Sequence, residues 1–200
     1  GQFGWIRDSG NAPGISSICA HESGLSGEKC AMLALTIDDR GTGAVAELSN
    51  YTYDEITIGQ SATYAKTVEE RDIQLFATVS GDVNPVHLDE AFAATTAFGE
   101  RIAHGMLTGA VVSAALAMEL PGPGTIYRSQ SLRFRAPVKI GDTVTVSLEV
   151  LEKQERRKTL TLHCKVHNQD QKLVATGTAE VLAPAEKLIL PRPELPVLEG

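Results

Sequence analysis

Cysteine is scarce in this chain, and its scarcity excludes several kinds of site. Only three cysteines occur among 200 residues, namely Cys19, Cys30 and Cys164. An odd and scattered set of this kind does not suggest a disulfide framework. Cys19 and Cys30 lie near His21, but a fourth ligand and the usual spacing of a zinc site are missing. We therefore expect no disulfides, no metal and a reducing, cytoplasmic setting.

The chain also lacks a long hydrophobic run and an excess of positive charge. Its longest apolar stretch, residues 105–118, is shorter than the roughly 20 residues needed to cross a bilayer. The first residues do not show the basic and then apolar order of a signal peptide. The net charge is −7, with 18 Lys and Arg against 25 Asp and Glu, which argues against general nucleic-acid binding. We expect neither a membrane nor a nucleic acid as partner.

Three regions of different composition divide the chain. Residues 1–50 are rich in Gly and Ser and have no sustained hydrophobic period, so we predict an N-terminal extension of uncertain order. Residues 51–183 contain the regular patterns and form the predicted domain. Residues 184–200 contain four prolines, which indicates a linker or an ordered strap.

Helical patterns dominate the first half of the predicted domain. A strand is predicted at residues 61–67, and a helix should begin with a capping box formed by Thr67 and Glu70. Gly81 should end that helix in a left-handed conformation. A second short helix is predicted over residues 88–98.

The second half begins with an apolar helix and continues with strands. Residues 105–118 predict a buried helix, because their large apolar side chains recur at helical spacing. Apolar and polar residues then alternate, which predicts strands at residues 125–136, 143–150, 159–166 and 173–182. The alternation indicates an antiparallel sheet with one buried face. Wrapping that sheet around the apolar helix gives a single α+β domain with a hot-dog fold.

The segment from Ser80 to Glu90 reads SGDVNPVHLDE and is the first candidate site. Pro85 fixes its own φ and disfavours a helical conformation at Asn84, so the loop should be stiff. Such a loop could hold the side chains of Asp82 and His87 on the same water molecule. A turn followed by a surface histidine explains the same residue types and is the commoner arrangement. A calcium site is disfavoured, because too few oxygen ligands are close by.

The start of the apolar helix is the second candidate. Free backbone N–H groups at a buried helix start can bind the oxygen of a polarised carbonyl, and Gly105 would allow its close approach. We expect His104 to pin this loop more than to react. Ser113, two turns further along, fits either packing or a ligand contact.

Four segments of the domain resemble the MaoC-like (R)-specific enoyl-CoA hydratases. They are residues 76–87, 103–107, 122–134 and 137–142, and the resemblance covers about residues 51–183. Within the first of them, the long and specific hydratase-2 motif of that family matches at Asp82, Asn84, Pro85 and His87.

The resemblance implies reversible, (R)-specific hydration of trans-2-enoyl-CoA to (3R)-3-hydroxyacyl-CoA. It makes Asp82 and His87 the catalytic pair, either of which could give the proton to Cα, and it places the N–H of Gly105 in the oxyanion hole. It implies that Asn84 braces the loop and that Ser113 helps to order the site. It further implies an acyl-CoA substrate, no metal or redox cofactor, and a homodimer whose sheets join edge to edge.

Several alternatives remain open at this point. The same scaffold could serve a (3R)-hydroxyacyl dehydratase acting on acyl carrier protein thioesters, or a non-catalytic module that binds acyl-CoA. A thioesterase is disfavoured by the intact Asp82 and His87 pair. The domain is also similar to the hydratase half of bifunctional enoyl-CoA hydratase/phosphate acetyltransferase proteins, and on that reading the proline-rich tail is where an acyltransferase domain would begin. Candidate partners for the phosphates of coenzyme A are Arg128, Arg133, Arg135, Lys139 and residues 156–158.

Overall fold

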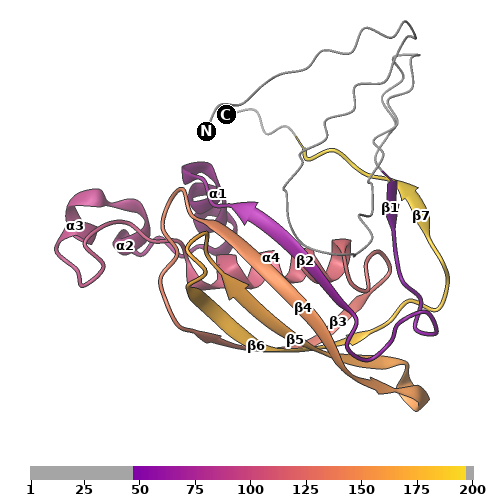
Figure 1. The fold of residues 1–200 in the computed structure, drawn as a ribbon. Coiled ribbons are helices and arrows are strands. Elements are labelled where there is room, and N and C mark those ends of the chain that lie inside the picture. The colour runs from indigo at the N-terminus through magenta and orange to yellow at the C-terminus, as the bar shows by residue number, and fades with distance from the viewer. Residues whose placement is uncertain (1–46, 197–200) are drawn as a thin grey trace, which may run out of the picture. The chain divides into compact units, whose positions relative to one another are not determined.

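The computed structural model describes residues 47–196 (Figure 1). Most of the predicted N-terminal extension, including Cys19, His21 and Cys30, lies outside the described residues. The boundaries predicted at residues 50 and 183 stay a prediction.

A five-stranded antiparallel sheet forms the body of the domain, with the strand order β2-β4-β5-β6-β3. Its strands are β2 (Ser61–Thr67), β3 (Ile126–Phe134), β4 (Thr143–Gln154), β5 (Thr159–His167) and β6 (Leu173–Leu182). Every strand predicted for this sheet is confirmed. The strand β4 runs on to Gln154 past a register shift between Val150 and Glu152, so it is longer than the predicted strand at residues 143–150. The turn that follows it is the short 3-10 helix η1 (Glu155–Arg157).

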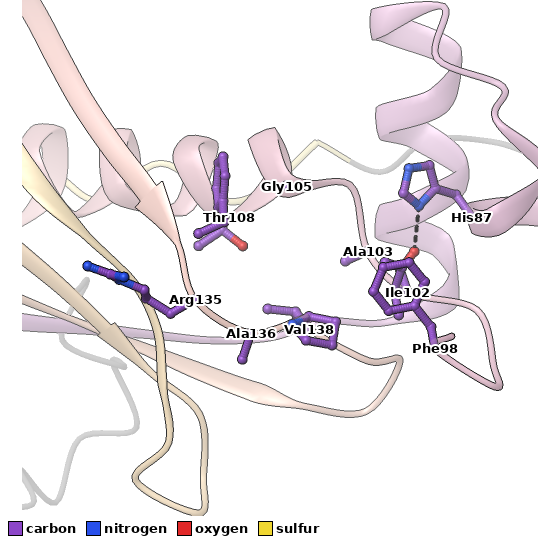
Figure 2. A pocket seen from close by; sticks show the side chains of 11 residues that line it. His87, Phe98, Ile102, Ala103, Gly105, Thr108, Arg135, Ala136 and Val138 are labelled. Carbon is purple, nitrogen blue, oxygen red and sulfur yellow. Dashed lines mark hydrogen bonds between the residues drawn. The ribbon is translucent and has the colours of Figure 1, made fainter. Parts of the chain in front are cut away.

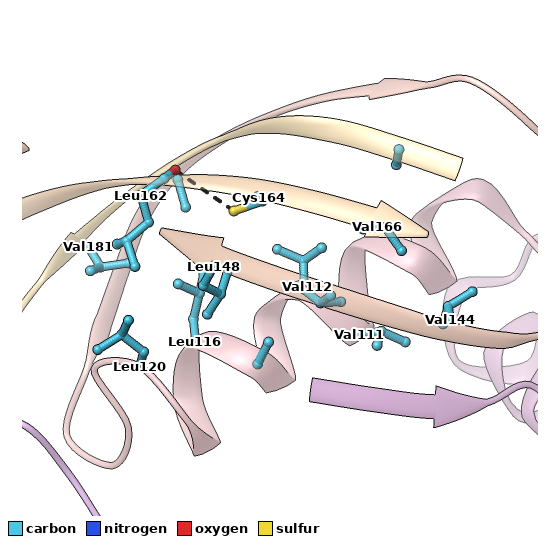
Figure 3. Close-up of a cluster of buried hydrophobic side chains, with 14 of the residues drawn as sticks. Val111, Val112, Leu116, Leu120, Val144, Leu148, Leu162, Cys164, Val166 and Val181 are labelled. Carbon is cyan, nitrogen blue, oxygen red and sulfur yellow. Dashed lines mark hydrogen bonds between the residues drawn. The ribbon is translucent and has the colours of Figure 1, made fainter. Parts of the chain in front are cut away.

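The predicted buried helix is α4 (Gly105–Met118), which packs against one face of the sheet. Val112, Ala115 and Leu116 of this helix are almost completely buried, and Figure 3 shows helix side chains facing residues such as Leu148 and Leu162 of the strands. Burying one side chain such as Leu116 contributes about 1.5–3 kcal/mol. This arrangement is the predicted α+β hot-dog fold. Within residues 47–196, no helix is both long and apolar enough to span a membrane.

The helix before the candidate loop is α1 (Glu70–Ser80), and its predicted cap is wrong. Thr67 ends β2, and its hydroxyl lies 2.8 Å from that of Thr143. The capping residue is Glu69, whose backbone N–H donates to the side chain of Asp72 at 2.8 Å. The helix ends as predicted at Gly81, where φ is 76°, a value that glycine adopts without steric cost.

The helix predicted over residues 88–98 is wrong in its bounds, because the helix there is only α3 (Glu90–Ala94) and Asp89 is its capping residue. Leu88 ends a separate short helix, α2 (Pro85–Leu88), which was not predicted. Asp89 has an extended backbone with φ of −113°, and its carboxylate accepts a hydrogen bond from the N–H of Phe92 at 3.0 Å. A side chain that captures a backbone N–H in this way starts a new helix and interrupts the old one.

A small second sheet pairs the two ends of the described chain. It consists of β1 (Glu47–Ser49) and β7 (Ile189–Pro191), which run antiparallel. Asn50 is completely buried beside it, and its side chain bonds to Pro123, Glu186 and Leu188. The residues after 183 are therefore tied to the start of the domain as far as Pro191.

Candidate active site

The loop between α1 and α2 is held by its own side chains. The backbone N–H of Asn84 donates to the Asp82 carboxylate at 3.2 Å, and the Asn84 side-chain oxygen accepts from the N–H of Val86 at 3.2 Å. Asn84 has φ of −52° and ψ of 126°, the extended conformation that a following proline favours. These bonds brace the loop locally, and they leave one carboxylate oxygen of Asp82 outside them.

His87 is buried, so the alternative of a surface histidine is wrong. It lies on α2 with 8% of its surface exposed. Its Nδ1 is 2.8 Å from the carbonyl oxygen of Ile102, and a dashed line marks this hydrogen bond in Figure 2. A carbonyl oxygen can only accept, so we assign the ring proton to Nδ1. In the neutral ring, Nε2 then carries a free lone pair that can accept a proton.

Asp82 and His87 are close enough to share one water molecule. A carboxylate oxygen of Asp82 and ring nitrogens of His87 and His104 all lie within 4.8 Å of one another. Two acceptors that each bind the same water at about 2.8 Å lie roughly 4.6 Å apart. The loop therefore brings together the two side chains that the sequence predicted as a pair.

Among the described residues, Asp82, His87 and His104 form one group that could hold a metal ion. The rings of His87 and His104 lie 3.9 Å apart between centroids and are inclined by only 32°. Nearly stacked rings do not direct their in-plane lone pairs toward one point, as a tetrahedral zinc site requires. Calcium and magnesium prefer oxygen ligands, of which the group has a single carboxylate. The geometry suits the movement of protons better than metal binding.

A cavity of about 360 Å³ opens beside His87. Its walls also include Gly105 and Thr108 from α4, and residues 134–138 at the end of β3. Figure 2 places His87 at one end of it and Arg135 at the other. Of the five basic groups proposed for coenzyme A, Arg135 is the one that lines this cavity.

The start of α4 is open, whereas the sequence indicated a buried helix start. Gly105 is exposed and 59% of the Met106 surface is accessible, although His104 before them is buried. As the first residue of the helix, Gly105 has an N–H without an intrahelical acceptor. The ring of Phe134 lies 3.4 Å from where a Cβ of residue 105 would stand. Gly105 itself lines the cavity that His87 also lines.

Ser113 is not among the residues that line the cavity beside His87. It lines a second cavity of about 330 Å³, together with Phe76, Met106, Tyr127 and other residues. Burial raises the pKa of Tyr127 to about 12, so its hydroxyl is neutral at physiological pH. The predicted role of Ser113 in ordering the site stays a prediction.

The contribution of His104 to the loop agrees with the expectation that it pins this region. Its Nε2 lies 2.9 Å from the backbone carbonyl of Asp82. The cavity walls formed by Phe98, Phe134 and Thr108 were not predicted as site residues. Their only sequence signal is an apolar or small side chain, which a core position shows equally.

Comparison with known proteins identifies the family of this chain. The family model for the MaoC like domain matches residues 55–171. An (R)-specific enoyl-CoA hydratase from Rhodospirillum rubrum is 48% identical over 141 residues, which cover 70% of this chain and 96% of the relative. A 3-hydroxybutyryl-CoA dehydratase from Methylorubrum extorquens is 43% identical over 141 residues, covering 70% of this chain and 89% of the relative.

A solved structure supports the same assignment. The unliganded R-hydratase PhaJ1 from Pseudomonas aeruginosa matches with a TM-score of 0.74 and 54% identity, over 78% of this chain and 99% of that one. With the family model spanning more than half of its residues, this chain belongs to the family of MaoC-like domain proteins.

Proposed function

We propose that this protein catalyses the reversible, (R)-specific hydration of trans-2-enoyl-CoA to (3R)-3-hydroxyacyl-CoA. The observation that carries the proposal is that a ring nitrogen of His87 and a carboxylate oxygen of Asp82 lie within 4.8 Å of each other, a separation one water can bridge. The names of the hydratase relatives supply the thioester and its stereochemistry. The direction named for the 3-hydroxybutyryl-CoA dehydratase is the reverse of the same equilibrium.

The two acceptors orient the water for attack. The water donates one hydrogen to Asp82 and the other to His87, so a lone pair of its oxygen is left for the substrate. That lone pair forms the new bond to Cβ, and the electron pair of the C=C bond moves toward the thioester carbonyl. A proton leaves the water for the pair, and the pair returns a proton to Cα. One C–O and one C–H bond form, and no electron donor or acceptor is needed.

The N–H of Gly105 can stabilise the enolate-like oxygen that develops in this step. It lies at the positive end of the α4 dipole and at the cavity lined by His87. Removing one oxyanion donor typically costs about 2.7–4 kcal/mol in activation free energy. Each positioned acid or base typically raises the reaction rate by about 10²- to 10⁴-fold. The oxyanion donor and the acid–base pair together can therefore supply a large rate enhancement.

We also propose that the protein acts as a homodimer. The strand β3 is an edge of the sheet and carries Ile126, Tyr127 and Phe134 with 38–58% of their surfaces exposed. An exposed apolar edge strand is a template for pairing with another strand. Pairing of β3 with its copy would join two sheets and cover these side chains near both cavities.

The dimer is tested by measuring mass in solution. Wild type should have twice the mass of one chain, and Ile126→Lys should shift it toward a monomer. Ile58→Lys is a matched control, since Ile58 is 65% exposed and lies outside β3. A monomeric wild type contradicts the proposal.

The catalytic proposal is tested with crotonyl-CoA as the substrate. Asp82→Asn and His87→Ala should each lower kcat by about 10² to 10⁴, with circular dichroism and mass in solution unchanged. Near-normal hydration by either variant contradicts it. A preference for an acyl carrier protein thioester over the CoA thioester would favour the dehydratase. Release of free thiol would indicate a thioesterase. Tight binding of the enoyl-CoA without turnover would indicate a non-catalytic module.

A further inference from the structure

His104 is buried where three parts of the site meet, and the proposed hydration does not use its side chain as an acid or a base. We propose that His104 is a positioning residue that fixes Asp82 and His87 relative to the N–H of Gly105. The inference rests on the proposed hydration, in which those three groups act on one substrate. It assigns to His104 no contact with the substrate.

The first contact is a hydrogen bond to the loop that carries Asp82. His104 Nε2 lies 2.9 Å from the backbone carbonyl oxygen of Asp82, and this oxygen can only accept. The proton of the neutral ring is therefore on Nε2. The bond fixes the main chain of Asp82, and this main chain determines where the Asp82 carboxylate lies.

The second contact is the face of the ring. His87 lies against it at 3.9 Å between centroids, and Phe76 of α1 lies 5.0 Å away with an interplanar angle of 47°. Only 2% of the His104 surface is exposed. His87 is therefore held by the carbonyl of Ile102 at its edge and by His104 on its face.

The third contact is covalent. His104 is the capping residue of α4 and precedes Gly105 directly, although its side chain makes no capping bond. One rigid ring thus links the backbone next to Gly105 to the main chain of Asp82 and to the ring of His87. A displacement of 1 Å in such an arrangement can cost about 10² in rate.

The remaining ring nitrogen shows that space filling alone does not explain this histidine. His104 Nδ1 is buried and has no hydrogen-bond partner within the part of the chain that the structure describes. A buried polar atom without a partner destabilises the fold. Phenylalanine would fill the same space without that cost, so the benefit of histidine must come from Nε2.

Three substitutions separate the hydrogen bond from the ring. His104→Phe keeps a ring and loses the donor. His104→Gln places an amide nitrogen as many bonds from Cα as Nε2, so it can donate to Asp82. His104→Asn places its nitrogen at the level of Nδ1, where it cannot reach that carbonyl.

We expect His104→Phe to keep or raise the Tm while kcat for crotonyl-CoA falls about 10- to 100-fold and KM changes by less than about 3-fold. His104→Gln should recover at least half of the lost kcat on a logarithmic scale, and His104→Asn should not. Wild-type kcat in His104→Phe overturns the inference, as does a loss of kcat that follows Tm across all three variants.

A second measurement does not depend on activity. Amide hydrogen exchange over residues 81–87 should be faster in His104→Phe and His104→Asn than in wild type, with His104→Gln closer to wild type. Unchanged exchange in all three overturns the inference. Failure of the wild-type protein to hydrate any enoyl thioester would instead overturn the proposed function. The exchange measurement would still show whether the hydrogen bond from His104 holds the loop at residues 81–87.

Discussion

The two ring nitrogens of His87 have different roles, one in the structure and one in the proposed reaction. Nδ1 donates to the carbonyl of Ile102 at 2.8 Å, which holds the ring in one orientation and one tautomer. Nε2 is left with a free lone pair, and the ring lies close to the carboxylate of Asp82. A backbone carbonyl does not lose its acceptor capacity over the working pH range, so this tautomer is maintained without help from a second ionisable group.

At Gly105 a proline would remove the backbone N–H while keeping the start of the helix. Gly105→Pro should lower kcat for crotonyl-CoA by about 10² to 10³ at nearly unchanged Tm. Proline is well tolerated at the first position of a helix, and His104 already has the extended ψ of 135° that a following proline favours. Steady-state kinetics and thermal unfolding check both parts.

Gly105→Ala is the matched control for that substitution. It keeps the N–H, and its Cβ would meet the Phe134 ring at 3.4 Å, an ordinary contact distance. We expect kcat within about 3-fold of wild type, far from the loss that a missing donor causes. Equal kcat losses in the two variants would show that the donor of Gly105 is not used.

At the scale of elements, Arg101 connects the helices around the site. Its guanidinium donates to both carboxylate oxygens of Glu70 on α1, at 2.7 and 2.8 Å, and to Glu90 on α3 at 3.0 Å. Arg101 directly precedes Ile102, whose carbonyl orients His87. The paired and partly buried guanidinium therefore helps to hold the backbone on which the His87 tautomer depends.

Replacing Arg101 should destabilise the protein in a pH-dependent way. The hydrogen bond from Arg101 lowers the pKa of the Glu70 carboxyl from its ordinary value of 4.5. A pKa that is lower in the folded than in the unfolded state stabilises the fold above the unfolded-state pKa, and this contribution is lost as pH falls through the folded-state pKa. Arg101→Gln should therefore lower Tm at neutral pH, by an amount that shrinks below pH 4.5.

Arg101→Lys is the control for charge without geometry. Lysine keeps the positive charge but cannot pair with both Glu70 oxygens as a planar fork does. Its Tm should lie between those of wild type and Arg101→Gln. A Tm difference for Arg101→Gln that is the same at acid and neutral pH would contradict the role given to Glu70.

The edge strand β3 depends on Gly177 of β6. A Cβ at residue 177 would lie 1.8 Å from the carbonyl oxygen of Ser131, so the backbone of one strand would have to move. Because Leu132 and Phe134 of β3 line the two cavities, Gly177→Ala should reduce both stability and kcat. We expect at least the 1–3 kcal/mol typical of overpacking, measured by denaturant unfolding.

The neighbouring residue provides a control for Gly177. Thr176→Ala removes a hydroxyl that bonds to His163 at 3.2 Å and adds no atoms. Thr176→Ala should lower the free energy of unfolding by about 0.5–1.5 kcal/mol, the contribution of one hydrogen bond. A Gly177→Ala protein as stable as Thr176→Ala would mean that β3 and β6 separate more easily than their geometry indicates.

At the scale of the whole molecule, the paired ends β1 and β7 close the described chain. Asn50 provides the link, with an oxygen that accepts from Leu188 at 2.9 Å and an amide that donates to Pro123 and Glu186 at 3.0 and 2.9 Å. These bonds lie outside both cavities. The chain ends therefore contribute stability separately from the chemistry.

Asn50→Ala should separate stability from activity. Each buried polar group left without a partner costs about 1–3 kcal/mol, and 1 kcal/mol lowers Tm by roughly 2–4 °C in a protein of this size. We expect Tm to fall by several times this amount, because the Asn50 side chain makes three such bonds. The kcat measured well below Tm should stay near the wild-type value. A parallel loss of kcat at low temperature would show that the ends influence the site.

The sequence predicts the regular elements well because each depends on a local pattern. The alternation of Val144, Val146 and Leu148 with polar residues defines β4, and all three are buried as predicted. The break at Asp89 was missed because two local signals compete there. An acid suits the first turn of a helix already begun, but Asp89 instead caps a new one.

The candidate site was predictable only in part. Asp82 and His87 are joined by a short stiff loop, so their spacing in the sequence indicates their spacing in space. The orientation of His87 depends on the carbonyl of Ile102, fifteen residues away, and a backbone group leaves no trace in a sequence. The cavity wall at Phe134 and Arg135 depends on where β3 ends against α4, which no local pattern determines.

The most direct test of the account is chiral analysis of the product formed from crotonyl-CoA by the wild-type protein. The account predicts (3R)-3-hydroxybutyryl-CoA as a single enantiomer, because the paired Asp82 and His87 deliver the water to one face of the substrate. A racemic product, the (3S) enantiomer, or no hydrated product at all would contradict it.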